Sequence, residues 1–205
     1  MSKWYARFPL TPEPEPKILT EEVRRKARIG RTHWEARIQQ VPDRLPYKAA
    51  IKRYIRHMHD WYEPAGCGLV LYGKVGHGKT ALGSIVLRNA LARGGYALSI
   101  RATEMVDHLY TNPNFRFDPG WPPLIEMLHG VTFLLLDDLV EEDKVWRLRY
   151  VENVLRARYD ERLPTIITTN VDKDSMFAIN WLKSLFFERY HGIEVSGINW
   201  RLDPP

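Results

Sequence analysis

The chain has 205 residues, of which 44% are apolar, and a formal net charge of +5 at pH 7. This length suits one ordinary domain plus an extension, and the apolar content excludes a disordered chain. No apolar run approaches the roughly 20 residues that a membrane span needs, and the N-terminus lacks the apolar core of a signal peptide. We therefore expect a cytoplasmic protein with no membrane partner. Cys67 is the single cysteine, which excludes a disulfide framework or a cysteine zinc site within one chain.

The basic residues are concentrated near the N-terminus. Residues 17–56 hold twelve Lys and Arg residues against four acidic ones, a net charge of +8, whereas residues 57–205 hold sixteen against nineteen, a net charge of −3. A field of this kind favours binding to nucleic acid or to an acidic protein surface. The alternative is an ordinary solvated helical face.

Residues 1–45 are predicted to form an extension that binds DNA or a protein partner. Proline alternates with threonine and glutamate near its start, so residues 1–17 are expected to be an extended tail, flexible or docked on a partner. Thr20 is expected to cap a basic helix that reaches about residue 40, is weakened at Gly30 and has few apolar residues to bury. Two prolines then break the chain, and a helix over residues 47–62 is predicted to pack on the domain that follows.

Residues 73–80, the phosphate loop, carry the pattern G-x-x-x-x-G-K-[ST], which is typical of a loop that holds the phosphates of a nucleotide. A short buried strand is predicted before this loop, over 68–72, and a helix after it, over 80–93. A chance glycine-rich turn is the alternative, but these flanking elements are the ones that the motif requires. Lys79 is expected to reach the β- and γ-phosphates of ATP and Thr80 to ligate Mg²⁺. The predicted ATP-binding residues of the loop are Gly73, Lys74, Val75, Gly76, His77, Gly78, Lys79, Thr80 and Ala81.

A strand over 96–100, a helix over 103–110 and a polar, proline-containing loop over 111–123 are predicted next. Basic and aromatic residues at the end of this strand and in the loop are candidates for phosphate contact and base stacking with single-stranded DNA. They are Arg101, Arg116, Phe115 and Phe117. The alternative is a packed aromatic loop.

An apolar strand predicted over 131–136 ends in two carboxylates, Asp137 and Asp138. This is the form of a Walker B element, in which the strand delivers Asp137 beside the phosphate loop to hold Mg²⁺. Asp138 then stands where a general base polarises the attacking water. A helix cap or loop carboxylate pair is the alternative.

A long helix over 144–162 and a β-branched strand over 165–168 follow. Asn170 comes directly after this strand, where its amide is expected to orient the water or contact the γ-phosphate; a simple turn is the alternative. The alternation of strands and helices from residue 66 onward predicts a parallel sheet covered by helices on both faces, with ligands at the carboxyl ends of its strands.

These motifs, in this order, resemble the AAA+ ATPases of the DnaC/DnaI helicase-loader and IstB type. The resemblance depends on the phosphate loop, on residues 134–139, on Arg158-Tyr159 and on residues 164–170, and it spans about residues 44–201. It implies an α/β P-loop NTPase fold, an AAA+ core over residues 46–205, without a C-terminal lid domain. The N-terminal extension then stands outside this core.

The resemblance also implies two arginine roles near the C-terminus. Arg189 lies in the segment that carries the arginine finger of these ATPases, and an arginine at a subunit edge stabilises charge on a neighbour's γ-phosphate. Arg201 lies at the end of a Gly-x-x-x-Arg segment and is implied to be the sensor 2 arginine, which contacts the nucleotide of its own subunit. An ordinary surface or salt-bridged arginine is the alternative for each.

The chain departs from the AAA+ pattern at two positions of the Walker B segment. Asp138 stands where glutamate is usual, which suggests slow turnover, and Val140 stands where glycine is frequent. The catalytic residues are expected to be Lys79, Asp138, Asn170 and Arg189.

The function predicted from these motifs is an Mg²⁺-dependent ATPase that acts on DNA and assembles into an oligomer. A DnaC-like loader of the replicative helicase is the leading interpretation. An IstB-like ATPase that delivers DNA to a transposase is an alternative with the same nucleotide chemistry. A second alternative is a scaffold that binds ATP and oligomerises with little turnover.

Overall fold

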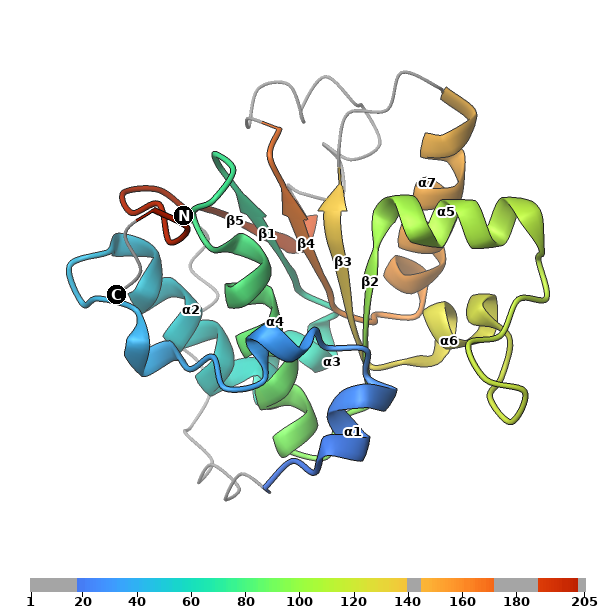
Figure 1. Ribbon diagram of the computed structural model, residues 1–205, viewed down its shortest axis with the longest axis horizontal. Helices are drawn as coiled ribbons and strands as arrows, with labels where there is room; N and C mark the ends of the chain where they lie inside the picture. Colours follow the sequence, from blue (N-terminus) through green and yellow to red (C-terminus); the bar gives the residue numbers. More distant parts are fainter. Residues whose placement is uncertain (1–17, 140–144, 172–187, 203–205) are drawn as a thin grey trace.

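The computed structural model describes residues 18–139, 145–171 and 188–202. In this part of the chain five parallel strands form one sheet in the order β2-β3-β4-β1-β5 (Figure 1). The strands are β1 (Gly68–Tyr72), β2 (Ala97–Arg101), β3 (Phe133–Leu139), β4 (Thr165–Thr169) and β5 (Tyr190–Glu194). Since all the strands are parallel, their carboxyl ends meet at one edge of the sheet.

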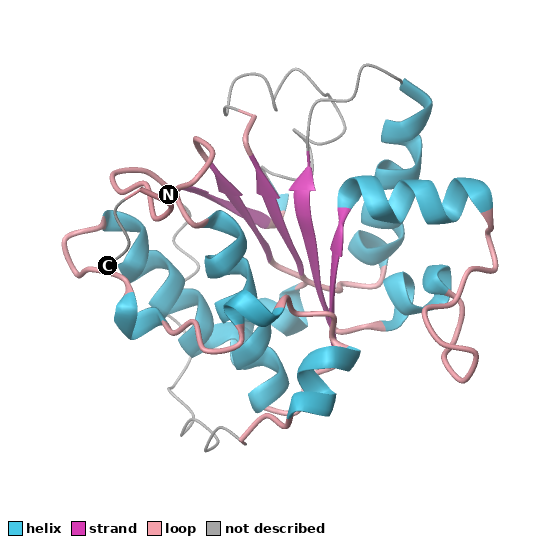
Figure 2. Cartoon of the chain, viewed as in Figure 1, coloured by secondary structure: helices cyan, strands magenta, loops and turns pink. Residues whose placement is uncertain are grey.

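Helices cover both faces of this sheet (Figure 2). The helices are α1 (Glu21–Lys26), α2 (Pro46–His57), α3 (Glu63–Ala65), α4 (Lys79–Ala92), α5 (Ala102–Thr111), α6 (Leu124–Gly130) and α7 (Val145–Asp160). Two 3-10 turns, η2 (Arg31–His33) and η3 (Ile38–Gln40), lie between α1 and α2, and a π-helical turn, η4 (Met58–Tyr62), follows α2. The predicted α/β fold with a parallel sheet flanked by helices is confirmed.

Alternate residues of the strands enter two separate cores. Leu69 and Leu71 of β1 pack with α2 and α4, whereas Val70 packs on the other face with α5, α6 and α7. In β3, Leu135 joins the first core and Leu136 the second. Strands buried on both faces read as continuous apolar runs, which is why the sequence pattern identified them.

The prediction of a basic helix reaching about residue 40 was wrong. Thr20 does cap a helix, since its hydroxyl accepts a hydrogen bond of 3.3 Å from the Val23 amide, but α1 ends at Lys26. Arg28 then adopts a positive φ of 57°, a conformation that ends a helix. The turn exposes the Ala27 carbonyl to the sheet, where it accepts a hydrogen bond of 2.8 Å from the Ser99 amide of the edge strand β2.

The expectation that this segment has little to bury was also wrong. Ala27, Ile29, Ile38 and Val41 are buried in the same core as α2 and α4. The described part of the extension therefore packs directly on the sheet domain. The division of the chain at residues 45 and 46 stays a prediction.

The helix α6 and the edge strand β5 were not predicted. The strand β5 pairs with β1 in parallel, from Gly68 with Tyr190 to Tyr72 with Glu194. Its sequence, Tyr-His-Gly-Ile-Glu, has weak apolar character, so only its place beside β1 makes it a strand. In the described residues, no helix is both long enough and apolar enough to cross a membrane.

The amino ends of β3 and β4 are joined by the fully buried Arg158 of α7. Its guanidinium donates hydrogen bonds of 2.8 to 3.1 Å to the carbonyls of residues 128, 131, 132 and 164, and one of 2.9 Å to the Thr165 hydroxyl. Burial lowers the pKa of Arg158 to about 10, so the group keeps its charge at neutral pH. This arginine ties α6, α7 and the two strands together at the edge opposite the carboxyl ends.

Candidate nucleotide site

The phosphate loop lies between β1 and α4, as the motif predicted. Gly76 and Gly78 both have φ of 86°, in the left-handed region that glycine adopts without strain. Lys79, the first residue of α4, is 7% exposed, and its Nζ donates hydrogen bonds to the carbonyls of Gly73 (2.7 Å) and Lys74 (2.8 Å). The ammonium group is thus held over the loop whose amides are placed to bind anionic phosphates at a helix N-terminus.

The electrostatic surroundings of Lys79 link the loop to three other charged residues. Burial lowers the pKa of Lys79, Asp138 and Asp137 oppose this effect, and the positive charge of Arg201 adds to it. The structure therefore brings Lys79, both Walker B carboxylates and Arg201 to the same site, although they are far apart in the sequence.

A β-bulge separates the roles of the two Walker B carboxylates. Leu136 pairs with Ile167 and Leu139 with Thr169, so β3 has one more residue than β4 over this stretch. Asp138 within the bulge has φ of 55° and is exposed, whereas Asp137 is 9% exposed. The bulge turns the second carboxylate outward and leaves the first beside the loop.

Thr168 of β4 holds both carboxylate residues in place. Its hydroxyl donates a hydrogen bond of 2.6 Å to Asp137 Oδ1 and accepts one of 2.8 Å from the Asp138 amide. Thr168 is 1% exposed, so water does not compete for these contacts. The sequence reasoning missed this residue, because a buried threonine in a β-branched strand carries no signal of its own.

Asn170 faces Asp138 directly. Its Nδ2 donates a hydrogen bond of 2.9 Å to Asp138 Oδ1. The structure thus brings the two predicted catalytic residues together at the carboxyl ends of neighbouring strands. The amide orients a carboxylate that would itself act on water.

The donor set fits Mg²⁺ bound together with a phosphorylated ligand. Mg²⁺ prefers oxygen ligands and, in nucleotide sites, takes one or two from the protein and others from phosphate and water. The Thr80 hydroxyl of α4 and the Asp137 carboxylate of β3 would supply such oxygen ligands. The described residues contain no cluster of three or more His, Cys, Asp or Glu that would bind a metal without phosphate.

Arg189 lies at the amino ends of the strands, on the opposite side of the sheet from the phosphate loop. It precedes β5, its carbonyl accepts a hydrogen bond from the Gly68 amide at the start of β1, and the phosphate loop follows the end of β1. Its Nη1 donates a hydrogen bond of 2.7 Å to the Tyr159 carbonyl, and its Cζ lies 3.9 Å from the centre of the Tyr159 ring. The structure does not bring Arg189 to the loop of its own chain, and its finger role stays a prediction that needs a neighbouring subunit.

The aromatic loop proposed as a DNA contact is packed against the protein. The Phe115 ring stacks on His108 at 3.7 Å, the Arg28 guanidinium lies 3.7 Å from the centre of the Phe117 ring, and both rings pack on the second core. Arg116 donates a hydrogen bond to the Trp121 carbonyl. The packed alternative is therefore the one observed, because both aromatic side chains have intramolecular partners.

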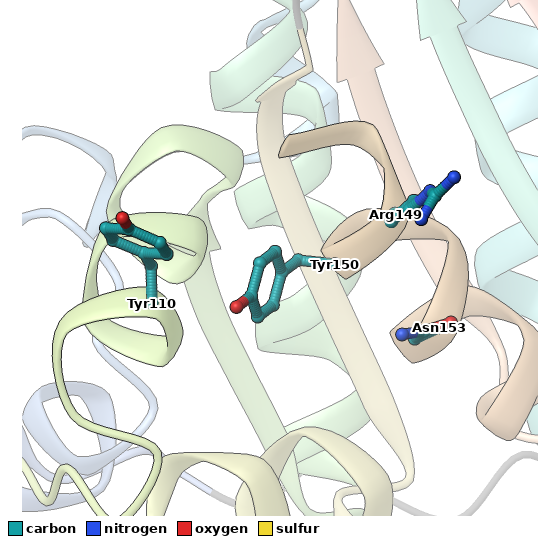
Figure 3. Close-up of a pocket in the computed structure, with 4 residues that line it drawn as sticks. All are labelled: Tyr110, Arg149, Tyr150 and Asn153. Carbon is teal, nitrogen blue, oxygen red and sulfur yellow. The ribbon is translucent and has the colours of Figure 1, made fainter. Parts of the chain in front are cut away.

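A different groove, between α5 and α7, combines exposed aromatic and basic side chains. It encloses about 500 Å³ and is lined by Tyr110, Arg149, Tyr150 and Asn153. In Figure 3 the Tyr150 ring extends from α7 toward Tyr110 of α5, with Asn153 one turn farther along α7. Arg147 of α7 and Asp107 of α5 form an ion pair of 2.8 Å that joins the two helices. No pattern in the sequence pointed to these residues as a group.

Many basic residues of the N-terminal segment have carboxylate partners. Arg24 and Arg37 both contact Glu35, at 2.9 and 3.0 Å, and Arg28 contacts Glu104 at 2.5 Å. These pairs reduce the field that the net charge of this segment suggested. Farther along the chain, helix α2 carries three exposed basic side chains on one face, namely Lys52, Arg53 and Arg56.

No protein-family model matches the chain, and no curated protein sequence is significantly similar to it. Solved structures with the same fold do exist. A crystal structure of the DnaC helicase loader has a TM-score of 0.67 and 18% sequence identity, over 82% of this chain and 100% of the other. A DnaI structure has a TM-score of 0.62 and 25% identity, over 83% of this chain and 93% of the other.

The replication initiator DnaA, solved with AMPPCP and single-stranded DNA, also has a TM-score of 0.62. Its identity is 19%, and the match covers 83% of this chain but 51% of DnaA. These relatives are AAA+ ATPases and replication proteins. The chain therefore has the AAA+ P-loop fold of the helicase loaders, and the resemblance predicted from its motifs is confirmed.

Proposed function

We propose that this AAA+ chain is an ATPase that uses ATP and Mg²⁺ to act on DNA as a loader of the replicative helicase. The observation that carries the nucleotide chemistry is the convergence of Lys79, Asp137, Asp138 and Asn170 at one edge of the sheet. The similarity to DnaC and DnaI structures supports the loader role.

In the proposed reaction, each side chain of the site has one task. The Lys79 ammonium leaves the carbonyls of Gly73 and Lys74 and instead donates charge-assisted hydrogen bonds to the β- and γ-phosphates. Thr80 and Asp137 would hold Mg²⁺, which neutralises phosphate charge when it is bound. Asp138, oriented by Asn170, polarises the attacking water, and Arg189 of a neighbouring subunit stabilises the charge on the transferred group.

Calorimetric titration of the protein with ATP and Mg²⁺ tests the binding step. We expect saturable binding by the wild type and a loss of roughly 100-fold in affinity for Lys79→Ala, since a buried cation directed at phosphates is removed. Lys52→Ala, which removes an exposed lysine of α2 outside the phosphate loop, is the control. Absence of ATP binding in the wild type would remove the basis of the proposal.

The finger role of Arg189 has a separate test. We expect Arg189→Ala to lower the rate of ATP hydrolysis roughly 1000-fold while ATP affinity changes less than about twofold, because a finger acts in the transition state. Arg156→Ala removes an exposed arginine of α7, and we expect this control variant to hydrolyse ATP at the wild-type rate. Equal rates for the two variants would contradict the finger role.

We assign the DNA contact to the groove between α5 and α7. Tyrosine rings stack on bases without sequence preference, and arginine contacts phosphate, so the lining suits single-stranded DNA. Tyr110→Ala should weaken binding of an oligonucleotide about tenfold, as measured by fluorescence anisotropy. Tyr96→Ala removes another exposed ring elsewhere on the surface, so a loss of the same size in that control would contradict the assignment.

The partner distinguishes a loader from a transposition ATPase. The proposal predicts that the tagged protein with ATP retains a replicative helicase in a pull-down, and that Lys79→Ala retains less. Recovery of a transposase instead would favour the IstB-like alternative. A wild type that binds ATP and oligomerises but hydrolyses it no faster than Asp138→Asn would favour the scaffold.

A further inference from the structure

The segment after β5, residues 195–202, crosses from the sheet to the phosphate loop, and we call it the C-terminal segment. It begins with a hydrogen bond of 2.8 Å from the Val195 amide to the Tyr72 carbonyl at the end of β1. The Val195 carbonyl is then 3.3 Å from His77 Nδ1 within the loop. The first part of the C-terminal segment thus lies along the phosphate loop, from Tyr72 at the end of β1 to His77.

The second part contacts the two inner glycines of the loop. The Trp200 amide donates a hydrogen bond of 2.9 Å to the Gly76 carbonyl. A Cβ atom added at Gly76 would lie 2.5 Å from Asn199 Oδ1, and one added at Gly78 would lie 3.2 Å from the Trp200 ring. Asn199 therefore lies closer to Gly76 than a Cβ atom would normally allow, and Trp200 packs closely on Gly78.

This contact leaves the phosphate-binding groups of the loop available. Trp200 binds a carbonyl oxygen of the loop, whereas phosphates bind its amide N–H groups. Docking of the C-terminal segment and binding of a nucleotide are thus compatible in one molecule.

Trp200 is also anchored from the side of α2. It packs on the first core, which also contains Tyr47 of α2. The Tyr47 side chain is 2% exposed. The ring is therefore held between α2 and the phosphate loop.

Arg201 follows directly and is exposed. Its amide donates a hydrogen bond of 3.1 Å to Asn199 Oδ1, the atom that lies against Gly76, so this bond closes a tight turn at the phosphate loop. The position of Arg201 depends on this turn, since its own side chain has no recorded hydrogen bond among the described residues.

We propose that Trp200 is a positioning residue that docks on Gly76 and Gly78 and thereby presents Arg201 to the phosphates of the bound nucleotide. The inference depends on the proposed ATP binding and adds to it the residue that sets the distance between Arg201 and the loop. Because the phosphate loop is expected to hold the β- and γ-phosphates through Lys79, an arginine presented at this loop favours ATP over ADP.

A double-mutant cycle tests the proposal through the affinities for ATP and for ADP, both with Mg²⁺. Arg201→Ala should weaken ATP binding about tenfold and ADP binding less than about threefold. Trp200→Ala should have the same effect on both nucleotides. The double variant should bind ATP no more than about twofold more weakly than Arg201→Ala, since the two residues act as one unit.

Two further variants separate positioning from general structure. Trp200→Phe keeps a ring against Gly78 and should restore ATP affinity to within about threefold of the wild type, whereas Leu202→Ala, which removes an exposed side chain, should leave it unchanged. Where Trp200→Ala unfolds in thermal scans, Trp200→Leu replaces it in the cycle, because its apolar side chain still fills the core.

Losses of ATP affinity that multiply in the double variant would overturn the proposal. If the double variant binds ATP about 100-fold more weakly than the wild type, or if ADP and ATP weaken equally in the Trp200 variant, then Trp200 acts on the loop and not through Arg201. Wild-type affinity for ATP in the Trp200→Ala variant would also overturn the proposal. A wild type that binds neither nucleotide would instead refute the proposed function.

Discussion

The two edges of the sheet use similar polar residues in opposite ways. At the carboxyl edge, Asp138 and Arg201 are exposed and Lys79 is held by two loop carbonyls that a phosphate can replace. At the amino edge, Arg158 is fully buried, and four carbonyls and one hydroxyl accept its hydrogen bonds. The amino edge satisfies its charge internally, whereas the carboxyl edge keeps charges available for a ligand.

This difference separates stability from function along a single strand. Thr165 at the start of β4 binds Arg158, and Thr168 three residues later binds Asp137. The same residue type serves the fold at one end and the site at the other. Substitutions that remove the contacts of Arg158 should therefore change the free energy of unfolding, and those at the carboxyl edge should change binding or turnover.

The largest expected effect is on stability, from Arg158→Met. The variant leaves several buried carbonyls without a donor, and we expect a loss of about 3–5 kcal/mol in the free energy of unfolding. Urea denaturation followed by circular dichroism measures it. Arg156→Met, on the exposed face of the same helix, should change stability by less than about 0.5 kcal/mol. A loss below about 1 kcal/mol for Arg158→Met would mean that the amino edge does not depend on this cation.

Asp138→Asn should lower the rate of ATP hydrolysis about 100-fold with little change in ATP affinity. The substitution removes the proposed general base but keeps an oxygen that Asn170 can reach. Single-turnover hydrolysis and calorimetry separate the two quantities. Asp160→Asn, at the exposed end of α7, is the matched control. A parallel fall in affinity would place Asp138 among the binding groups.

Thr168→Val sharpens the comparison within β4. Without its hydroxyl, Asp137 loses a donor and the Asp138 amide loses an acceptor, so we expect the Mg²⁺ requirement of hydrolysis to rise about tenfold in concentration. Thr169→Val is the control, since within the described part of the chain that hydroxyl accepts only from the Val171 amide. If the two variants need the same Mg²⁺ concentration, Thr168 has a structural role alone.

The smallest expected effect concerns the contact between Tyr159 and Arg189. Tyr159→Leu removes the ring that faces the guanidinium but keeps the backbone carbonyl that accepts its hydrogen bond. A cation–π contact at a partly exposed site contributes about 0.5–1 kcal/mol, so hydrolysis by the assembled protein should fall about threefold. Tyr159→Phe should retain the wild-type rate. A loss for Tyr159→Phe as large as that for Tyr159→Leu would assign the effect to the hydroxyl and its partner Glu188.

The strongest predictions from the sequence were those in which local pattern and motif coincide. The phosphate loop lies between an apolar strand and a helix, and the residue types at Lys79 and Thr80 have few other uses in that context. The α1 prediction failed because a tertiary demand, namely that Ala27 and Ile29 reach the core, outweighed the local helix propensity on which the prediction depended. The strand β5 was missed because its pairing with β1 gives it order that its composition does not.

The sequence by itself determined the phosphate loop, the apolar strand that ends in Asp137 and Asp138, and the alternation that makes the sheet parallel, because each depends on residues close together in the chain. Only the tertiary structure decided that Thr168 links the two carboxylates, that Asn170 contacts Asp138, and that Trp200 lies on the phosphate loop. These contacts join residues that are 30 or more positions apart. Such pairs meet only when strand order and register are set, and no local pattern records them.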